Sequence, residues 1–402
     1  MKLDKMKRNV IVLFGGKSVE HDISIITGVQ IMHALDEKRF NVIPIYIKDN
    51  KWIFNENFKD ISVFANQSKI EGTQVTLSVT DGCLYKVCRS KQKLFLRIDF
   101  VFSSLHGGCG ENGSISGLLN IAHIPYAFSD VVGCSASMNK LVTKLCCTAT
   151  NIPIPNYAAL NEQDKKLGFK IMNNKLSKLK FPLIVKPNSL GSSIGITYCK
   201  TKKQLENAIS FAFMFDNVVL VEEVVQNLRE LNMSLMGNSM HVEFSKIEEV
   251  TTSKDFLSFE SKYLNAPTSN NKGMESMDRE ICVDINESVV ERMKEYGKLL
   301  FEHLSLSGCV RIDYLYDSKS DVLYVNEINS IPGSMANYLW KDKYSFKTLL
   351  NKVYDYGVEE FELKDKRTKS FSTSVLSQFS GASKIFLNKN KQSWKILTNN
   401  FD

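Results

Sequence analysis

The chain has 402 residues, of which 43% are hydrophobic, and its 51 lysines and arginines exceed its 44 aspartates and glutamates to give a formal net charge of +7. This composition excludes a disordered or fibrous chain and is typical of a globular protein with about two to three domains. The mild positive excess suits anionic small ligands, but it is too diffuse to indicate a nucleic acid as partner.

The cysteines and the apolar segments limit the class of protein further. The nine cysteines are scattered, odd in number and contain no C-x-x-C pair, so they indicate neither a disulfide framework nor a zinc site. The basic start is followed by too few apolar residues for a signal peptide, and no stretch approaches the length of a membrane span. We therefore expect reduced thiols and a soluble, cytoplasmic protein without a membrane partner.

Strands and helices alternate in the first part of the chain. Residues 10–14 have the pattern of a buried strand, and after the glycines of GGKSVEHD the apolar residues Ile23, Ile26, Val29 and Met32 predict a helix. A second predicted strand, residues 100–105, runs into the glycine-rich loop HGGCGENG and then a short helix. Two such loops after strands predict an open α/β sheet whose carboxyl ends hold a ligand.

The middle and end of the chain follow an α+β pattern. Residues 184–196, IVKPNSLGSSIGI, predict a hairpin, and further strands follow closely between residues 218 and 250. The polar residues 253–276 lack periodicity, so we interpret them as a functional loop or lid. The stretch ELKDKRTKSFSTS, residues 362–374, is typical of a linker or solvated arm.

Polar residues interrupt two strand-like runs between residues 309 and 333. Arg311, Asp313, Glu327 and Asn329 occupy alternate positions, so the polar side chains of each run should share one face. The last three offer oxygen ligands without histidine or thiol, a set that suits Mg²⁺ together with waters and substrate phosphates. The alternative is the solvated face of an edge hairpin, which the apolar neighbours and the adjoining SIPGS turn make less favourable.

Two lysines lie beside segments that could bind phosphate. Lys140 lies in SASMNK, and Lys186 ends an apolar strand next to the turn NSLGSSIG. The backbone N–H groups of this turn and the hydroxyls of Ser192 and Ser193 are suitable donors to phosphate oxygens. Taken singly, each is also typical of an exposed lysine or a plain hairpin turn.

The order of these motifs carries a resemblance. The motifs follow the order found in ATP-grasp enzymes. This order is a lysine, a lysine with a glycine loop, the acidic pair Glu222 and Glu223, a polar lid, R-x-D and N-E-x-N. Over roughly residues 8 to 355 the chain resembles the D-alanine–D-alanine ligase family in LFGGKSVEHDIS, HGGCGENGSISG, SMNK, VKPNSLGSSIG, FESKY, RID and NEINSIPG.

The resemblance implies a fold that combines α/β and α+β parts, namely an ATP-grasp fold with an N-terminal open α/β domain. It places the substrate domain at residues 1–127, a central ATP-grasp subdomain at 128–225, a C-terminal subdomain with the metal site and the lid at 226–355, and an extension at 356–402. Relatives in this family are commonly homodimers.

The resemblance also implies roles for the residues that match the motifs. ATP would be held by Lys140, Lys186, Ser193 and the lid residue Lys262 at its phosphates, by Glu222 and Glu223 at the adenine and by Glu230 at the ribose. Mg²⁺ or Mn²⁺ would bind to Asp313, Glu327 and Asn329. Arg311 and the N–H group of Gly333 would form an oxyanion site, because charge develops there in a tetrahedral intermediate.

The remaining implied roles concern the amino acid substrates. Glu20 would hold the first substrate's ammonium group and would be linked through Ser192 to Tyr263 on the lid. His106, Ser334 and Tyr338 would border the substrates. The implied reaction joins two D-alanines with ATP, through an acyl phosphate, to give D-alanyl-D-alanine for peptidoglycan synthesis.

Departures from the family pattern leave alternatives open. The segment PGSMANYLW lacks the threonine and the following element that commonly contact the second substrate's carboxylate, so a ligase that joins D-alanine to D-serine or another D-amino acid is the alternative. A catalytically idle nucleotide-binding protein is a third possibility, against which the intact lysine, arginine and acidic set argues.

Overall fold

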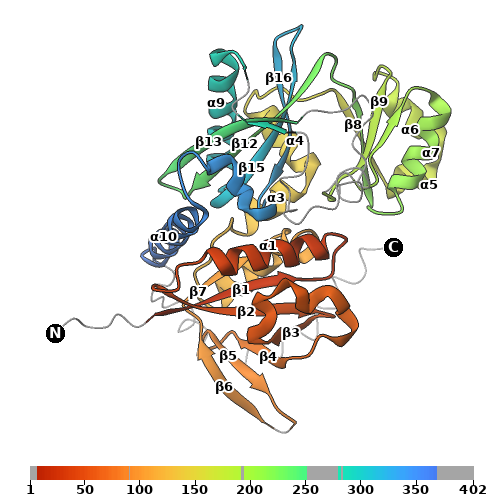
Figure 1. Cartoon of the computed structure of the whole chain (residues 1–402). Helices are drawn as coiled ribbons and strands as arrows, with labels where there is room; N and C mark the ends of the chain where they lie inside the picture. The colour runs from red at the N-terminus through yellow and green to blue at the C-terminus, as the bar shows by residue number, and fades with distance from the viewer. Residues whose placement is uncertain (1–6, 90, 192–193, 251–278, 282–283, 369–402) are drawn as a thin grey trace, which may run out of the picture. The chain divides into compact units, whose positions relative to one another are not determined.

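The computed structural model describes residues 7–89, 91–191, 194–250, 279–281 and 284–368 of the chain (Figure 1). The chain divides into two compact units, residues 1–361 and 362–402. In the second unit, the described residues contain the end of the last helix. Over the part of the chain that the structure describes, no helix combines the length and apolarity that crossing a membrane requires.

A seven-stranded sheet forms the N-terminal part of the first unit, in the order β6-β5-β4-β3-β2-β1-β7 (Figure 1). Strands β1 (Arg8–Gly15), β2 (Phe40–Lys48) and β7 (Phe100–Ser103) are parallel. An antiparallel meander continues the sheet through β3 (Lys51–Phe54), β4 (Thr73–Ser78), β5 (Cys83–Val87) and β6 (Gln92–Arg97). The two glycine loops follow β1 and β7, so both lie at the same sheet edge, as predicted.

Helices and turns accompany this sheet. The helices are α1 (His21–Ala34) and α2 (Ser114–Ile121), and the 3-10 helices are η1 (Glu56–Lys59), η2 (Ile61–Lys69) and η3 (Gly108–Gly110). Helix α1 packs against β1, and the glycine at residue 28 permits close approach because a Cβ there would lie 2.7 Å from Phe14 Cβ. The strand-loop-helix prediction for this region is confirmed.

The second sheet is antiparallel and has the order β10-β9-β11-β8. It contains β8 (Tyr157–Asn161), β9 (Leu183–Pro187), β10 (Thr197–Cys199) and β11 (Val218–Glu223), with α5 (Glu162–Leu167), α6 (Phe169–Leu176) and α7 (Lys202–Ala212) alongside (Figure 1). Strands β9 and β10 pair antiparallel, as the hairpin prediction required. Helices α3 (Val131–Met138) and α4 (Lys140–Ala149) precede this sheet.

The third sheet has the order β14-β13-β12-β15-β16. Its strands are β12 (Leu228–Gly237), β13 (Val242–Val250), β14 (Arg279–Ile281), β15 (Gly308–Asp317) and β16 (Val322–Asn329). Helix α9 (Glu287–His303) packs on it, and η5 (Gly333–Trp340) and α10 (Phe346–Asp365) follow. The stretch that we interpreted as a linker from residue 362 begins inside α10, so that interpretation is wrong for residues 362–365. The predicted lid at residues 253–276 lies outside the described residues.

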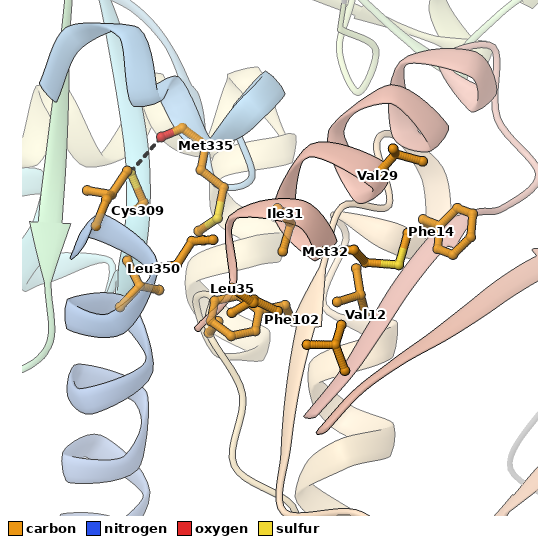
Figure 2. Packing of buried hydrophobic residues seen from close by; sticks show 14 of the residues in the cluster. Val12, Phe14, Val29, Ile31, Met32, Leu35, Phe102, Cys309, Met335 and Leu350 are labelled. Atoms are coloured by element: carbon orange, nitrogen blue, oxygen red, sulfur yellow. Dashed lines mark hydrogen bonds between the residues drawn. The ribbon is translucent and has the colours of Figure 1, made fainter. Parts of the chain in front are cut away.

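One hydrophobic core joins the first sheet to η5 and α10. Figure 2 shows Phe14 and Phe102 of the first sheet and Ile31 of α1 in the same cluster as Met335 of η5 and Leu350 of α10. These side chains are almost fully buried, and each buried aliphatic or aromatic side chain stabilises the fold by about 1.5–3 kcal/mol. The shared core therefore fixes the turn after β16 against the N-terminal sheet and its glycine loops.

Candidate active site

Four polar side chains lie on one face of strands β15 and β16. The register places Arg311 opposite Asn329 and Asp313 opposite Glu327, and residues directly opposite share a face. Arg311 donates to both Asp313 carboxylate oxygens, from Nε at 2.6 Å and from Nη2 at 2.7 Å. Asn329 Nδ2 donates to the same carboxylate at 3.2 Å. The prediction that these alternate positions share one face is confirmed.

The electrostatics of this face favour additional positive charge. Burial raises the pKa of Asp313 and Glu327 adds to this effect, while Arg311 opposes it. Burial works against the charge on Arg311, but Asp313 outweighs it and raises the pKa of the guanidinium above its ordinary value. Arg311 is thus positively charged and hydrogen-bonded to Asp313, which is one of the two opposing carboxylates Asp313 and Glu327. Lys140 Nζ, 3.2 Å from Glu327 Oε2, offsets part of the repulsion between the two carboxylates, and a further cation would offset more of it.

A buried hydrogen-bond network on β12 and β13 extends this face. Asn232 of β12 stands opposite Asp313, and its Nδ2 donates to Glu248 Oε1 at 2.9 Å. Tyr338 donates its hydroxyl to the same Glu248 oxygen at 2.6 Å. Glu230, two residues before Asn232 on the strand, therefore lies on the same side of β12. Tyr338 thus belongs to the buried network that continues the acidic face onto β12 and β13.

Lys140 lies where helix α4 begins, next to the acidic face. Its Nζ is 3.2 Å from Glu327 Oε2 and donates to the Leu190 carbonyl at 2.6 Å. Asn188 caps the start of the helix, because its carbonyl accepts from Lys140 N at 3.0 Å and its Oδ1 accepts from Leu141 N at 2.8 Å. The loop after β9 is thereby fastened to the helix, so that Lys140 faces both the loop and β16.

A second lysine cluster is buried beside it. Glu222 of β11 lies between two ammonium groups, with Oε2 2.9 Å from Lys186 Nζ and Oε1 3.1 Å from Lys144 Nζ. Lys186 Nζ also donates to Asn326 Oδ1 at 3.1 Å, which links the second sheet to the third. Burial opposes the charge on Glu222, but the lysines outweigh it and lower its pKa, while burial lowers the pKa of Lys144. Two cations share one carboxylate, an excess of positive charge that suits an anionic ligand.

The glycine-containing loops after β7 and β9 lie close to the carboxyl groups of Glu20 and Glu111. A Cβ at Gly107 would lie 3.1 Å from Glu20 Oε2, and one at Gly191 would lie 3.3 Å from Glu20 Oε1. Glu111 accepts from Gly107 N at 2.7 Å. Burial, followed by the charge of Glu20, raises the pKa of Glu111 to about 8. Glu111 therefore keeps its proton near neutral pH, and a bound cation such as an ammonium group would favour its ionisation beside Glu20.

His106 is buried behind this pair and contacts the turn after β16. Its Nε2 lies 3.3 Å from Thr27 Oγ1, which in turn accepts from Ser334 N at 3.1 Å. Ser334 Oγ donates to Gln30 Oε1 at 2.5 Å. Burial lowers the pKa of His106 to about 4, so the imidazole is neutral near neutral pH. His106 therefore acts on Ser334 through Thr27 and carries no charge of its own.

The turn itself has an unusual backbone. Ser334, Met335 and Ala336 have φ values of 51°, 51° and 48°, in the left-handed region that residues with a Cβ rarely adopt. Met335 N donates to the Pro332 carbonyl at 2.8 Å. Strained backbone of this kind persists where the surrounding contacts hold it, and it is common at functional sites. Gly333, the predicted oxyanion residue, begins this turn.

An open pocket connects Lys140, the acidic face and the loops after β7 and β9. The residues that line it come from α3, α4, β16 and the turn that follows it, and from the loops after β7 and β9; they are Glu111, Ser137, Met138, Lys140, Leu190, Gly191, Glu327, Ile328, Asn329 and Ser330.

Several predicted residues lie elsewhere or outside the description. Glu222 and Glu223 are adjacent on β11, so their side chains point to opposite faces. Glu223 accepts from Asn156 Nδ2 at 3.0 Å and from Lys180 N at 2.8 Å, away from the lysine cluster. The predicted residues Ser192, Ser193, Lys262 and Tyr263 lie outside the described residues.

Sequence reasoning missed four residues of the site: Lys144, Glu111, Asn188 and Thr27. Lys144 follows Lys140 by four positions on a helix, a spacing that places both on one face and could have revealed it. Glu111 lies within the glycine loop that we had identified. Asn188 and Thr27 gave no local signal, because their partners are distant in the sequence.

The donor atoms can be compared with the needs of a metal ion. In the described ranges, no group of three or more histidine, cysteine, aspartate or glutamate side chains could hold a metal ion. The predicted set offers two carboxylates and one amide. Mg²⁺ commonly takes one or two carboxylates and completes its shell with phosphates and waters. The residues present therefore fit Mg²⁺ when a bound nucleotide supplies further oxygens.

Solved structures resemble the chain along nearly its whole length. A D-alanine–D-alanine ligase from Coxiella burnetii has a TM-score of 0.75 at 24% identity, covering 94% of this chain and 99% of that one. One from Bacillus anthracis, complexed with ATP, has a TM-score of 0.64 at 21% identity and covers 89% and 99%. The VanG D-Ala:D-Ser ligase of Enterococcus faecalis has a TM-score of 0.73 at 24% identity and covers 88% and 99%. These likenesses show the ATP-grasp fold.

Family models and curated relatives match the sequence itself. The models described as D-ala D-ala ligase N-terminus and C-terminus match residues 9–129 and 146–354. A D-alanine–D-alanine ligase from Thermosipho melanesiensis is 36% identical over 92% of this chain and 98% of its own length. One from Thermosipho africanus is 37% identical over 90% of this chain and 96% of its own. With both models covering most of the sequence and relatives matched almost end to end, the chain belongs to the D-alanine–D-alanine ligase family.

Proposed function

We propose that this chain is an ATP-dependent ligase that joins two D-alanines into D-alanyl-D-alanine, for use in cytoplasmic peptidoglycan synthesis. The observation that carries the proposal is the pocket in which Lys140 and the carboxylate of Glu327 meet the glycine loops around Glu20 and Glu111. Groups suited to phosphate, to a metal ion and to an ammonium group thus border one small space.

The proposed reaction follows from the chemistry of the carboxyl group. A carboxylate is a poor acyl donor, so the first D-alanine takes the γ-phosphoryl group of ATP and becomes an acyl phosphate. The amine of the second D-alanine attacks its carbonyl carbon, loses a proton and expels phosphate to form the peptide bond. No protein nucleophile is required, and catalysis consists of positioning and of neutralising phosphoryl charge.

The lysines are proposed to bind the phosphates. Lys186 shares Glu222 with Lys144, so the buried cluster keeps an excess positive charge that an anionic phosphate would balance. Lys140 contacts Glu327 and the Leu190 carbonyl, which holds its ammonium group at the pocket. We extend the proposal to Ser193 and Lys262 at the phosphates and to Glu222, Glu223 and Glu230 at the nucleoside. Glu223 accepts hydrogen bonds from Asn156 and Lys180, so a role at the nucleoside would require it to give up these contacts.

The acidic face is proposed to hold Mg²⁺ or Mn²⁺ through Asp313, Glu327 and Asn329. When bound, this ion neutralises charge on the transferred phosphoryl group. Arg311, fixed by its two hydrogen bonds to Asp313, and the N–H group of Gly333 would stabilise the oxyanion of the tetrahedral intermediate.

The carboxylate pair is proposed to bind the first substrate. Glu20, with Ser192 and Tyr263, would hold the ammonium group of D-alanine. The glycine loops leave space directly beside the Glu20 oxygens, where any Cβ would intrude. His106 supports Ser334 through Thr27 and so shapes the region proposed for the second substrate.

The proposal is tested with Glu327→Gln, which removes one carboxylate from the acidic face. We expect Mg²⁺-dependent release of ADP in the presence of D-alanine to fall by at least about a hundredfold, because a phosphoryl-transfer site loses a charged metal ligand. Glu291→Gln on α9, an exposed glutamate paired with Lys294, is the control and should keep full activity. Full activity of Glu327→Gln would refute the metal assignment.

The second amino acid is tested separately. D-amino acids are supplied singly and in pairs, and the products are identified by mass. D-Alanyl-D-alanine as the main product supports the proposal, whereas D-alanyl-D-serine would favour the alternative ligase. The alternative stays open because Ser334 and Asn337 occupy the turn where the family pattern differs.

A further inference from the structure

Among the residues that the structure describes, Ser137 has a buried hydroxyl without a hydrogen-bond partner, and the residue lines the pocket. It lies one residue before the end of α3, is 3% exposed, and its Oγ has no hydrogen-bond partner among the residues that the structure describes. The same residue lines the pocket together with Lys140 and Glu327. A buried hydroxyl that has no partner among the described residues, on a residue that lines a polar pocket, is available to a ligand.

Neighbouring hydroxyls show that this is not a general property of these helices. Ser135 Oγ donates to the Val131 carbonyl at 2.6 Å, within its own helix. Thr143 Oγ1 on α4 donates to the Ala136 carbonyl at 2.9 Å. Ser135 uses the carbonyl that its own helix offers, and Thr143 uses a carbonyl of the neighbouring helix α3. Ser137, between them, does not.

The surroundings indicate which ligand atom the hydroxyl meets. Lys140, three residues after Ser137, turns its ammonium group towards Glu327 at the same pocket. Under the proposed function this is where the phosphoryl group passes between nucleotide and substrate, bearing several anionic oxygens. A hydroxyl donor adjacent to a lysine completes the coordination of such a group, because a serine can donate where glutamates only accept.

We propose that Ser137 Oγ is a ligand-binding group that donates a hydrogen bond to an oxygen of the transferred phosphoryl group. The assignment rests on the proposed function for the identity of the phosphoryl group. It goes beyond that function by giving α3 a direct part in binding, alongside the lysines and the acidic face.

The test compares Ser137→Ala with Ser135→Ala, two hydroxyl deletions on one helix. Thermal unfolding without ligands is measured first. Because the Ser137 hydroxyl has no hydrogen-bond partner to lose among the described residues, Ser137→Ala should melt at the wild-type temperature or above it. A structural hydroxyl would instead lower the melting temperature when removed.

Binding and turnover are measured next. With Mg²⁺ present, Ser137→Ala should bind the ATP analogue AMP-PNP about tenfold more weakly than wild type and bind ADP equally well, because only the former carries a γ-phosphate. Its kcat/KM for ATP should fall by about tenfold or more, while Ser135→Ala stays near wild type in every measurement. The KM for D-alanine should not change.

Three results would overturn the proposal. These are unchanged AMP-PNP affinity and kcat/KM in Ser137→Ala, a lower melting temperature in the same variant, or a loss confined to the KM for D-alanine, which would place the hydroxyl on the amino acid. If wild type releases no ADP with D-alanine, the proposed function fails instead. The AMP-PNP and ADP affinities still decide the role of Ser137 in that case.

Discussion

The buried imidazole of His106 makes the stability of this protein depend on pH in a predictable direction. His106 is 5% exposed and has Thr27 Oγ1 at 3.3 Å as a neutral neighbour. Burial lowers its pKa from 6.5 to about 4, because the charged imidazolium would lose its hydration without gaining an anionic partner. The perturbation to apply is a fall in pH below 6.5, the ordinary pKa of histidine.

The sign of the effect follows from which state binds the proton. Above pH 6.5 the imidazole is neutral in both states, and the contribution to stability is fully present. Between 6.5 and about 4 the unfolded chain takes up a proton that the folded protein excludes, so stability is lost as the pH falls. The shift corresponds to about 3 kcal/mol in total, of which about 2 kcal/mol is lost between about pH 7 and pH 5.

The assay compares wild type with His106→Gln, which keeps a hydrogen-bonding amide but cannot be protonated. Urea unfolding at about pH 7 and pH 5 should show about 2 kcal/mol less loss in the variant than in wild type. Thr27→Val is the control: it removes the hydroxyl but leaves the imidazole buried, so it should retain the wild-type difference between the two pH values.

A direct measurement can refute the reasoning. Histidines labelled with ¹³C at Cε1 are followed by NMR as the pH is lowered, and the His106 resonance is identified by its absence in His106→Gln. It should stay at the neutral position down to about pH 5. Titration with a midpoint near 6.5 would show that burial does not control this group, and equal pH dependence in wild type and His106→Gln would contradict the linkage.

Two further predictions concern the charged cluster and the glycine loops. Glu222→Gln leaves two buried ammonium groups without their carboxylate, so it should lower the free energy of unfolding by about 3 kcal/mol or more, measured in urea. Adding Lys144→Met to this variant should recover part of the lost stability. If Glu222→Gln alone had a free energy of unfolding within about 1 kcal/mol of wild type, the buried pairing would be contradicted. Gly107→Ala, at φ +70°, would place a Cβ 3.1 Å from Glu20 Oε2, so it should raise the KM for D-alanine as well as reduce stability by about 1–2 kcal/mol. Gly168→Ala, at φ +87° with nothing within 4 Å of its Cβ, has a similar backbone cost and should leave KM unchanged; equal KM values in the two variants would argue against Glu20 as the ammonium ligand.

Local periodicity made the acidic face predictable. The alternation of Arg311 with Asp313 and of Glu327 with Asn329 fixes the face of each strand, and a short polar turn between the runs makes them pair. The position of the glycine loops at one sheet edge also followed, since the strands that precede them are parallel neighbours. In both places the information lies within a few residues of the chain.

The same periodicity was overlooked for the acidic pair on β11. Adjacent strand residues face opposite sides, so Glu222 and Glu223 cannot both border one ligand face. The structure turns Glu222 to the lysines and Glu223 to Asn156 and Lys180. The family resemblance implied that both residues border the adenine, whereas strand geometry allows only one of the two side chains to point to that face.

Long-range contacts account for what could not be predicted. Thr27 receives the Ser334 N–H group across 307 positions of sequence, and this contact holds a left-handed turn in residues that disfavour it. A sequence pattern reports local preference, and here the preference of Ser334 to Ala336 is overruled by the core that joins η5 to α1.

The distribution of charge also explains how one pocket can orient a zwitterion. Beside the pocket, Lys144 and Lys186 share the single carboxylate of Glu222, whereas Glu20 lies close enough to Glu111 for its charge to raise the pKa of that group. An amino acid bound with its ammonium group towards the carboxylate pair presents its carboxylate towards the lysine side, whereas the reverse orientation sets like charges against each other at both ends. Under the proposed function, the placement of these charges alone therefore orients the carboxyl group of the first D-alanine towards the phosphates. Contacts with the methyl group of D-alanine are not needed for this orientation.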